Sequence, residues 1–153
     1  MIIAIGSDHA GYPLKEQVIE AIQEMGHSII DVGTDNATEP VDYPDYVYKV
    51  GMDILNGKAD RGILVCGSGV GASITANKMR GIYAGLCHDT YSAHQGVEHD
   101  GMNVLCLGGR IIGSELAREI VHSFLNAQVE EAERHQKRRG KMRSIESGKY
   151  KGK

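Results

Sequence analysis

The sequence of 153 residues lacks the features that mark membrane and secreted proteins. It has no run of the roughly 18 to 20 apolar residues that a helix needs to cross a bilayer, so we expect no membrane span. Its first residues, MIIAIGSDHAG, have neither the basic flank nor the small-residue cleavage site of a secretory signal. We therefore expect a cytoplasmic protein without a membrane partner.

Cysteine is scarce, and its positions show no pairing pattern. Cys66, Cys87 and Cys106 are odd in number, no CxxC occurs, and each lies in or beside an apolar run. This pattern argues against a disulfide framework and against a cysteine zinc clamp. We expect reduced thiols, with Cys87 and Cys106 serving as small core residues.

Aromatic residues are also few: they make up 5% of the chain, and tryptophan is absent. Basic residues, in contrast, gather at one end, because residues 134–153 carry a net charge of +8 and the rest of the chain carries −11. Such a tail could bind nucleic acid with a strong dependence on salt. No RNA-reading motif or aromatic platform accompanies it, so we expect no nucleic-acid partner.

Short apolar runs alternate with amphipathic stretches along the chain, and no linker, repeat or low-complexity segment interrupts them. Continuous hydrophobicity predicts buried strands at 2–6, 27–34, 62–66, 82–87 and 103–109. Helical spacing predicts helices at 12–26, 42–57, 70–79, 91–99, 114–128 and 130–145. The alternation indicates one α/β domain over residues 1–153, a three-layer sandwich with a five-stranded parallel sheet. Its basic C-terminal helix and tail, residues 130–153, are expected to contact a neighbouring subunit.

Polar residues follow the predicted strands at their carboxyl ends, where open parallel sheets bind their ligands. In GILVCGSGVG, residues 62–71, three glycines allow a tight turn whose N–H groups can face an anion. Cys66 precedes this turn and is a candidate base or nucleophile. A base beside such N–H groups suits proton abstraction next to a carbonyl, and it also suits thiol-dependent acyl transfer.

Two arginines on the C-terminal helix favour a phosphorylated ligand. Arg134 and Arg138 are four residues apart and share a helix face, so they can grip one phosphate, with Arg110 after the fifth strand joining them. The other basic residues of this helix are expected in solvent or against another subunit: Lys137, Arg139, Lys141 and Arg143.

Two further ligand classes fit parts of the pattern. The stretch GSGVGA, with Asp89 about 20 residues further on, fits a dinucleotide fingerprint, although the loop follows the third strand and no second domain for a substrate follows. Asp8, His9 and His88 could hold a metal for an isomerase, although no helical two-histidine motif occurs.

Seven motifs cover nearly the whole chain in order: SDHAGY, DVGT, VDYPDY, GILVCGSGVG, ITANK, NVLCLGGRIIG and ERHQKR. In these motifs the chain resembles the type B ribose-5-phosphate isomerase family, which includes galactose-6-phosphate isomerase subunits. The resemblance implies a Rossmann-like sheet, a homodimer or homotetramer with shared active sites, and neither metal nor cofactor. It implies aldose–ketose isomerisation of a sugar phosphate, foremost ribose 5-phosphate to ribulose 5-phosphate. Allose 6-phosphate and galactose 6-phosphate are the alternative substrates.

The resemblance also implies roles for single residues. Cys66 matches the base that moves a proton between C2 and C1, and His99 matches the acid that opens the sugar ring. Asp100 stands where the family usually has asparagine; the change removes amide donors and adds a charge, so it bears on which sugar is bound. The residues that match substrate ligands are Asp8, His9, Tyr43, Gly67, Ser68 (in place of a common threonine), Gly69, Val70, Gly71, Asp100, Arg110, Arg134 and Arg138.

Overall fold

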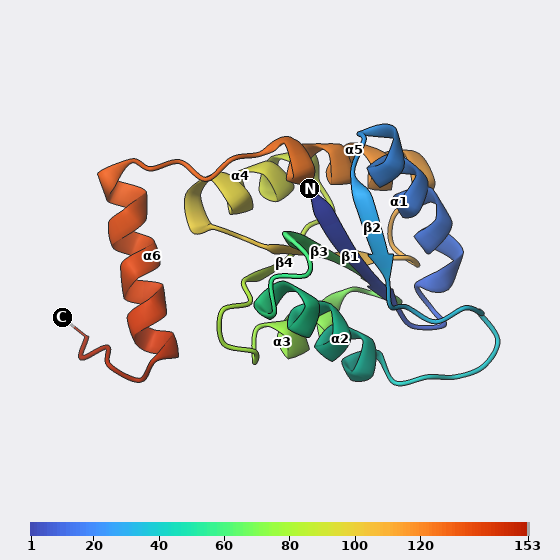
Figure 1. Cartoon of the computed structure of the whole chain (residues 1–153), viewed down its shortest axis with the longest axis horizontal. Coiled ribbons are helices and arrows are strands. Elements are labelled where there is room, and N and C mark those ends of the chain that lie inside the picture. Colours follow the sequence, from blue (N-terminus) through green and yellow to red (C-terminus); the bar gives the residue numbers. More distant parts are fainter. Residues whose placement is uncertain (153) are drawn as a thin grey trace.

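The computed structural model describes residues 1–152, and its strands form one parallel sheet (Figure 1). The strand order is β2-β1-β3-β5-β4, and every neighbouring pair is parallel. This confirms the five-stranded parallel sheet expected from the sequence. The two edge strands are shorter than the apolar runs, because an edge strand has a neighbour on one side only. The strands are β1 (Ile2–Ser7), β2 (Ser28–Asp31), β3 (Arg61–Cys66), β4 (Ala84–Leu86) and β5 (Val104–Gly108).

Helices cover both faces of the sheet, which confirms the three-layer arrangement (Figure 1). Helices α1 (Tyr12–Glu24), α4 (Thr90–Asp100) and α5 (Ser114–Asn126) bury one apolar cluster against the sheet. Helices α2 (Tyr43–Leu55) and α3 (Val70–Ala76) bury a second cluster on the other face. Within residues 1–152, no helix has the length and hydrophobicity of a membrane span.

Local sequence signals explain where several helices begin. Proline stands in the first turn of α1 and of α2, where its missing N–H costs nothing. The Asp89 carboxylate accepts the N–H of Ser92 at 2.7 Å and so caps α4. This hydrogen bond lowers the pKa of Asp89. Capping therefore accounts for Asp89 without a nucleotide.

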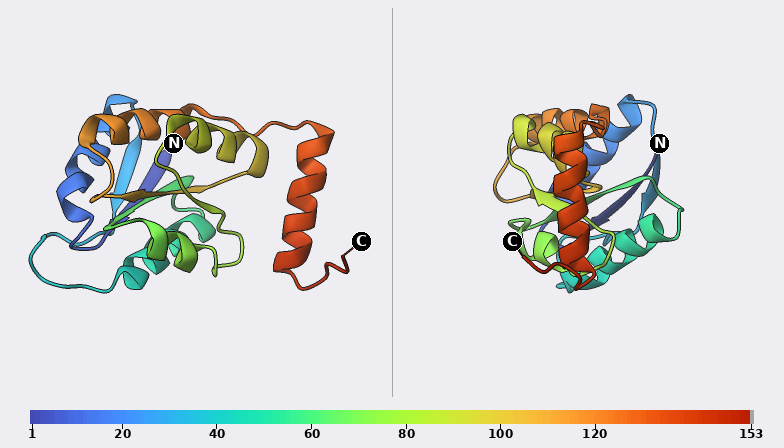
Figure 2. Two further views of the ribbon diagram at one scale, coloured as in Figure 1. Left: turned by 180° about the vertical axis from the view of Figure 1, so that it is seen from behind. Right: turned by 90° about the vertical axis from the view of Figure 1, so that its left-hand side faces the viewer.

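The last helix, α6 (Glu133–Glu146), stands apart from the three layers, beyond the β4 edge of the sheet (Figures 1 and 2). It begins three residues later than predicted, because the segment before it is an extended connection. Arg139 is buried and donates hydrogen bonds to the carbonyl oxygens of His99 at 3.1 Å and Glu130 at 3.0 Å. The expectation that Arg139 faces solvent or another subunit is therefore wrong: it anchors α6 to its own chain.

Candidate active site

The strands β1, β3 and β5 end side by side, since the register pairs Ser7 with Val65 and Cys66 with Gly108. Helix α1 then leaves toward one face of the sheet and α3 toward the other, which opens a crevice between the loops. A cavity of about 380 Å³ lies there, a size common among small-ligand sites. It is lined by Asp8, His9, Ala10, Tyr43, Cys66, Gly67, Ser68, Gly71, Arg110 and Ile111.

The Cys66 thiol is held by the glycine loop that follows it. The thiol is buried, and its Sγ accepts the N–H of Gly69 at 3.1 Å. Gly69 has a φ of 79°, in the left-handed region that favours glycine, and this turn brings its amide under the sulfur. The other two cysteines are core residues, as predicted: burial raises the pKa of Cys87 to about 11 and raises that of Cys106 as well.

Two polar residues after β1 form one wall of the cavity. The Asp8 carboxylate accepts the N–H of Gly11 at 2.8 Å, at the start of α1. His9 Nδ1 accepts the N–H of Val41 at 3.2 Å, so in the neutral ring the proton belongs on Nε2. Both side chains are thereby fixed at the mouth of the crevice.

The proposed metal set of Asp8, His9 and His88 is not assembled. His88 Nε2 accepts the N–H of Gly108 at 3.0 Å, and His88 does not line the cavity. The donor atoms of these three residues form no cluster that could hold an ion within residues 1–152.

Tyr43 and Arg110 close the cavity from two other elements. A side-chain carbon at Gly71 would lie 2.7 Å from Cζ of Tyr43, so the ring packs directly on the first turn of α3. The N–H of Arg110 donates to the carbonyl oxygen of Gly67 at 3.0 Å. This backbone hydrogen bond holds Arg110 beside the glycine loop, and its guanidinium lines the cavity, suited to an anionic ligand.

Four of the predicted residues, His99, Asp100, Arg134 and Arg138, lie at the other end of the molecule. Because α4 links two parallel strands, it runs antiparallel to them. Its last residues, His99 and Asp100, therefore lie near the amino ends of the strands, whereas Cys66 lies at a carboxyl end. Arg134 and Arg138 are exposed residues of α6, and this helix lies on that far side (Figure 2). Within one chain, Arg110 therefore does not lie beside Arg134 and Arg138.

The family model described as Ribose/Galactose Isomerase matches residues 3–142. The chain belongs to this family. It is 44% identical over 146 residues to the putative sugar phosphate isomerase YwlF of Bacillus subtilis, a match that covers 95% of this chain and 97% of the relative. It is 44% identical over 144 residues to ribose-5-phosphate isomerase B of Escherichia coli, covering 94% and 95%.

Solved structures of the family have the same fold. The structure of ribose-5-phosphate isomerase B from Clostridium thermocellum superposes with a TM-score of 0.92 at 44% identity, covering 97% of this chain and 99% of that one. Another relative, the D-erythrulose-4-phosphate isomerase of Pectobacterium atrosepticum, is 44% identical over 128 residues, 84% of each chain. The family therefore includes proteins named for different sugar phosphates.

In this family member, His99 lies in a group of residues that the sequence analysis did not single out. The Gln95 side-chain nitrogen lies 2.8 Å from His99 Nδ1, and the ring of His99 stacks on that of His135 with centroids 4.0 Å apart. Burial, the largest cause, lowers the pKa of His135. Glu130 approaches both rings. The spacing of four between Gln95 and His99 was the available signal; nothing in the sequence marked Glu130.

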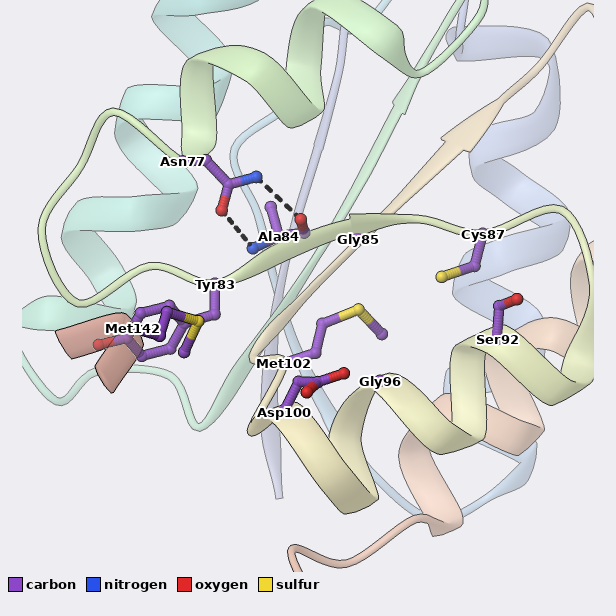
Figure 3. A pocket seen from close by; sticks show the side chains of 10 residues that line it. All are labelled: Asn77, Tyr83, Ala84, Gly85, Cys87, Ser92, Gly96, Asp100, Met102 and Met142. Carbon is purple, nitrogen blue, oxygen red and sulfur yellow. Dashed lines mark hydrogen bonds between the residues drawn. The ribbon is translucent and has the colours of Figure 1, made fainter. Parts of the chain in front are cut away.

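Asp100, the departure from the family pattern, borders a different cavity of about 240 Å³ (Figure 3). Its walls are mostly apolar and include Met102 and Met142. On one side the Asn77 carboxamide donates to the carbonyl oxygen of Ala84 at 2.8 Å and accepts its N–H at 3.0 Å. Within one chain, Asp100 therefore faces this cavity and not the one beside Cys66.

Proposed function

We propose that this member of the ribose/galactose isomerase family interconverts ribose 5-phosphate and ribulose 5-phosphate through an enediolate, without a metal ion. The observation that carries the proposal is the Cys66 thiol, seated under the Gly69 amide in a cavity that also holds Arg110. The names of the Escherichia coli and Clostridium thermocellum relatives support the choice of sugar. Free cysteine thiols fit a reducing compartment, and we place the enzyme in the cytoplasm.

In the proposed mechanism, the Cys66 thiolate removes the proton from C2 of the open-chain aldose. The C–H electron pair forms a double bond between C1 and C2, and the carbonyl oxygen on C1 becomes an oxyanion. Amides of the loop Gly67–Gly71 stabilise this oxyanion, a contribution of a few kcal/mol in comparable sites, about 3 to 4. The thiol then returns the proton to C1 as the double-bond electrons form the new C1–H bond. The proton of the C2 hydroxyl passes to the oxyanion on C1, so that C2 becomes the ketone carbonyl and C1 carries the hydroxyl. Asp8, His9 and Tyr43 hold the sugar hydroxyls.

The cavity of one chain is incomplete for this reaction, because Arg110 is the one arginine or lysine among its lining residues. The exposed guanidinium groups of Arg134 and Arg138 and the imidazole of His99 lie on the far side. We infer a two-fold homodimer in which α4 and α6 of one subunit complete the Cys66 cavity of the other. The attraction between the basic end and the acidic remainder of the chain favours this pairing. Two such dimers could form a homotetramer.

In this dimer, His99 donates the proton that opens the sugar ring. Arg134 and Arg138 join Arg110 around the phosphate, in the charge-assisted pairing that arginine makes with phosphate oxygens. Asp100 lies next to His99 in the sequence and reaches the same cavity, where its charge would select among sugar hydroxyls.

The direct test is isomerisation by the purified protein in the presence of EDTA. We expect ribose 5-phosphate to be converted faster than allose 6-phosphate, galactose 6-phosphate or erythrulose 4-phosphate. A clear preference for one of the other sugars would contradict the substrate but keep the chemistry. The Asp100→Asn variant, run beside the wild type, then measures how far this position sets the preference.

A mixing experiment tests the shared site. Cys66→Ala and His99→Ala proteins should each be inactive, since each lacks one group in every site. When equal amounts are mixed and allowed to exchange subunits, half of the dimers are hybrids, and each hybrid has one intact site. Activity should return to roughly a quarter of the wild-type value. No recovery, with hybrid dimers verified by mass, would contradict a site shared between subunits.

A further inference from the structure

His99, Glu130 and His135 form a compact set of donor atoms where α4 meets α6. His135 Nε2 lies 3.0 Å from Glu130 Oε2, and His99 Nε2 lies 3.9 Å from the same oxygen. The two rings are stacked within 15° of parallel. One donor atom from each residue lies within 4.8 Å of the other two. In the described part of the chain, residues 1–152, this is the one group of three such ligands.

The contacts at His135 Nε2 cannot all be satisfied by protons. Arg134 Nε, which is always protonated, lies 2.9 Å from this nitrogen and requires a lone pair there. Glu130 Oε2, at 3.0 Å, requires a proton on the same nitrogen. If the nitrogen accepts from Arg134, two lone pairs face each other between His135 and Glu130. A cation between the nitrogen and the carboxylate oxygen would satisfy both.

His135 is suited to be the fixed member of a binding site. It is 2% exposed, and its Nδ1 has no hydrogen-bond partner. The side chains of Glu130 and His99 are more accessible, with exposed fractions of 39% and 27%. A ligand can therefore reach the cluster from solvent on one side and meet a rigid donor on the other.

We propose that His99, Glu130 and His135 bind a divalent transition-metal ion, with Zn²⁺ as the preferred ion, and that the bound ion inhibits the enzyme. Two imidazoles and one carboxylate are a common set in zinc sites that keep an open coordination position. Mg²⁺ and Ca²⁺ prefer oxygen ligands and are disfavoured here. In a tetrahedral zinc site the ligand atoms are about 3.3 Å apart. Glu130 Oε2 is already close to this distance from His135 Nε2, at 3.0 Å, whereas His99 has to move inward, because its Nε2 lies 3.9 Å from Glu130 Oε2.

Two neighbouring side chains must adjust when the ion binds. Arg134 has to leave His135 Nε2, because its charge repels the ion; its side chain is two-thirds exposed and free to move. The Gln95 amide, now 2.8 Å from His99 Nδ1, has to rotate so that its oxygen accepts the proton from that nitrogen. The rotated amide then orients His99 as a ligand, as outer partners of metal-bound histidines do.

Inhibition rests on the proposed function, whereas binding does not. The ion occupies the imidazole that opens the sugar ring and displaces Arg134 from the phosphate. Both effects are lost when the ion is removed, so EDTA should restore activity.

Titration of the full-length protein with Co²⁺ tests binding directly. The visible d–d absorption of bound Co²⁺ should stop rising at one equivalent of Co²⁺ per chain, and added Zn²⁺ should displace the Co²⁺ and abolish the absorption. His135→Gln and Glu130→Gln should each weaken Co²⁺ binding at least tenfold. If His135→Gln fails to fold, Glu130→Gln decides, because Glu130 is partly exposed and lies in the connection before α6.

Two control variants exclude other donors. His27 Nδ1 lies 3.4 Å from the N-terminal amine, and Cys66 carries a soft thiol that binds such metals. His27→Gln and Cys66→Ala should leave the Co²⁺ spectrum unchanged. No spectrum in the wild type, or a spectrum lost in either control but kept in Glu130→Gln, would overturn the site.

An activity assay tests the second half of the proposal. Zn²⁺ should inhibit wild-type isomerisation reversibly, and Glu130→Gln should need at least a tenfold higher Zn²⁺ concentration for the same inhibition. Zn²⁺ that binds at the cluster without lowering the rate would overturn the inhibitory role. If the protein isomerises no sugar phosphate, the proposed function fails, and the Co²⁺ titration still decides whether the site exists.

Discussion

Replacing Gly69 by alanine should damage both stability and catalysis, whereas the same change at Gly57 should damage neither severely. Both glycines have left-handed backbones, with φ of 79° and 70°. A side chain at Gly57 would meet nothing within 4 Å. At Gly69 it would collide with the Leu86 side chain and lie 3.1 to 3.2 Å from the Leu107 backbone. Gly57 is thus a matched control for backbone strain alone.

The expected sizes follow from these surroundings. An L-residue in the left-handed region costs about 1 to 2 kcal/mol, and both variants should lose this much. Overpacking at Gly69 should add about 1 to 3 kcal/mol, because Leu86 can turn away but the Leu107 backbone cannot. For a chain of this size the Tm of Gly69→Ala should therefore fall roughly 2 to 10 °C below that of Gly57→Ala. Catalysis should fall at least tenfold, since the Gly69 amide no longer reaches Cys66.

Thermal unfolding and steady-state kinetics of both variants, under one set of conditions, measure these differences. A Gly69→Ala protein as stable and as active as Gly57→Ala would refute the account of the loop. A protein that is destabilised but fully active would separate the two claims: the packing would stand, and the role of the Gly69 amide under the thiol would not.

Four further substitutions test other parts of the structure. Arg134→Ala and Arg138→Ala should each raise KM about tenfold or more with little change in kcat, because they remove charged phosphate ligands; an unchanged KM would count against them. Arg139→Met should leave two partly buried carbonyl oxygens unpaired and lower the unfolding free energy by about 2 to 4 kcal/mol, with faster hydrogen exchange in α6 as its signature. Equal Tm and exchange rates in the two proteins would show that the anchor is dispensable. Burial raises the pKa of the Cys87 thiol to about 11 from a value of 9.0, because the folded state favours the neutral thiol. The stabilisation from this preference is present below pH 9 and is lost as the pH rises toward 11. Cys87→Ala should reduce the loss of stability across this window in pH-dependent denaturation, and an identical loss in both proteins would contradict the assignment.

The sequence pattern was sufficient for the layers and for half of the site. Strands that are apolar on both faces must be covered on both sides, so the alternation with helices predicted the sandwich. Residues that follow parallel strands lie at the same end of the sheet. Because β1, β3 and β5 are also neighbours in the sheet, eight of the predicted residues line one cavity, whereas His88, which follows β4, does not line it.

The position of His99 could have been predicted more closely, because a helix between two parallel strands must run back to their start. The burial of Arg139 could not: α6 is polar on all sides and shows no apolar stripe. A guanidinium that pairs with carbonyl oxygens of other segments leaves no periodic trace in the sequence. The same holds for the connection before α6, whose Glu130 approaches His99 and His135 only in three dimensions.

The hydrogen bonds of Asn77 limit the pairing of the β4 edge with a strand of another molecule. The strand β4 is one of the two edge strands of the sheet, and unpaired N–H and C=O groups on an edge strand can pair with a strand of another molecule. The Asn77 carboxamide occupies both backbone groups of Ala84, in the way a neighbouring strand would. One side chain thus ends the hydrogen-bond ladder of the sheet and opposes edge-to-edge aggregation. The rest of that surface remains free for a specific contact in a closed oligomer.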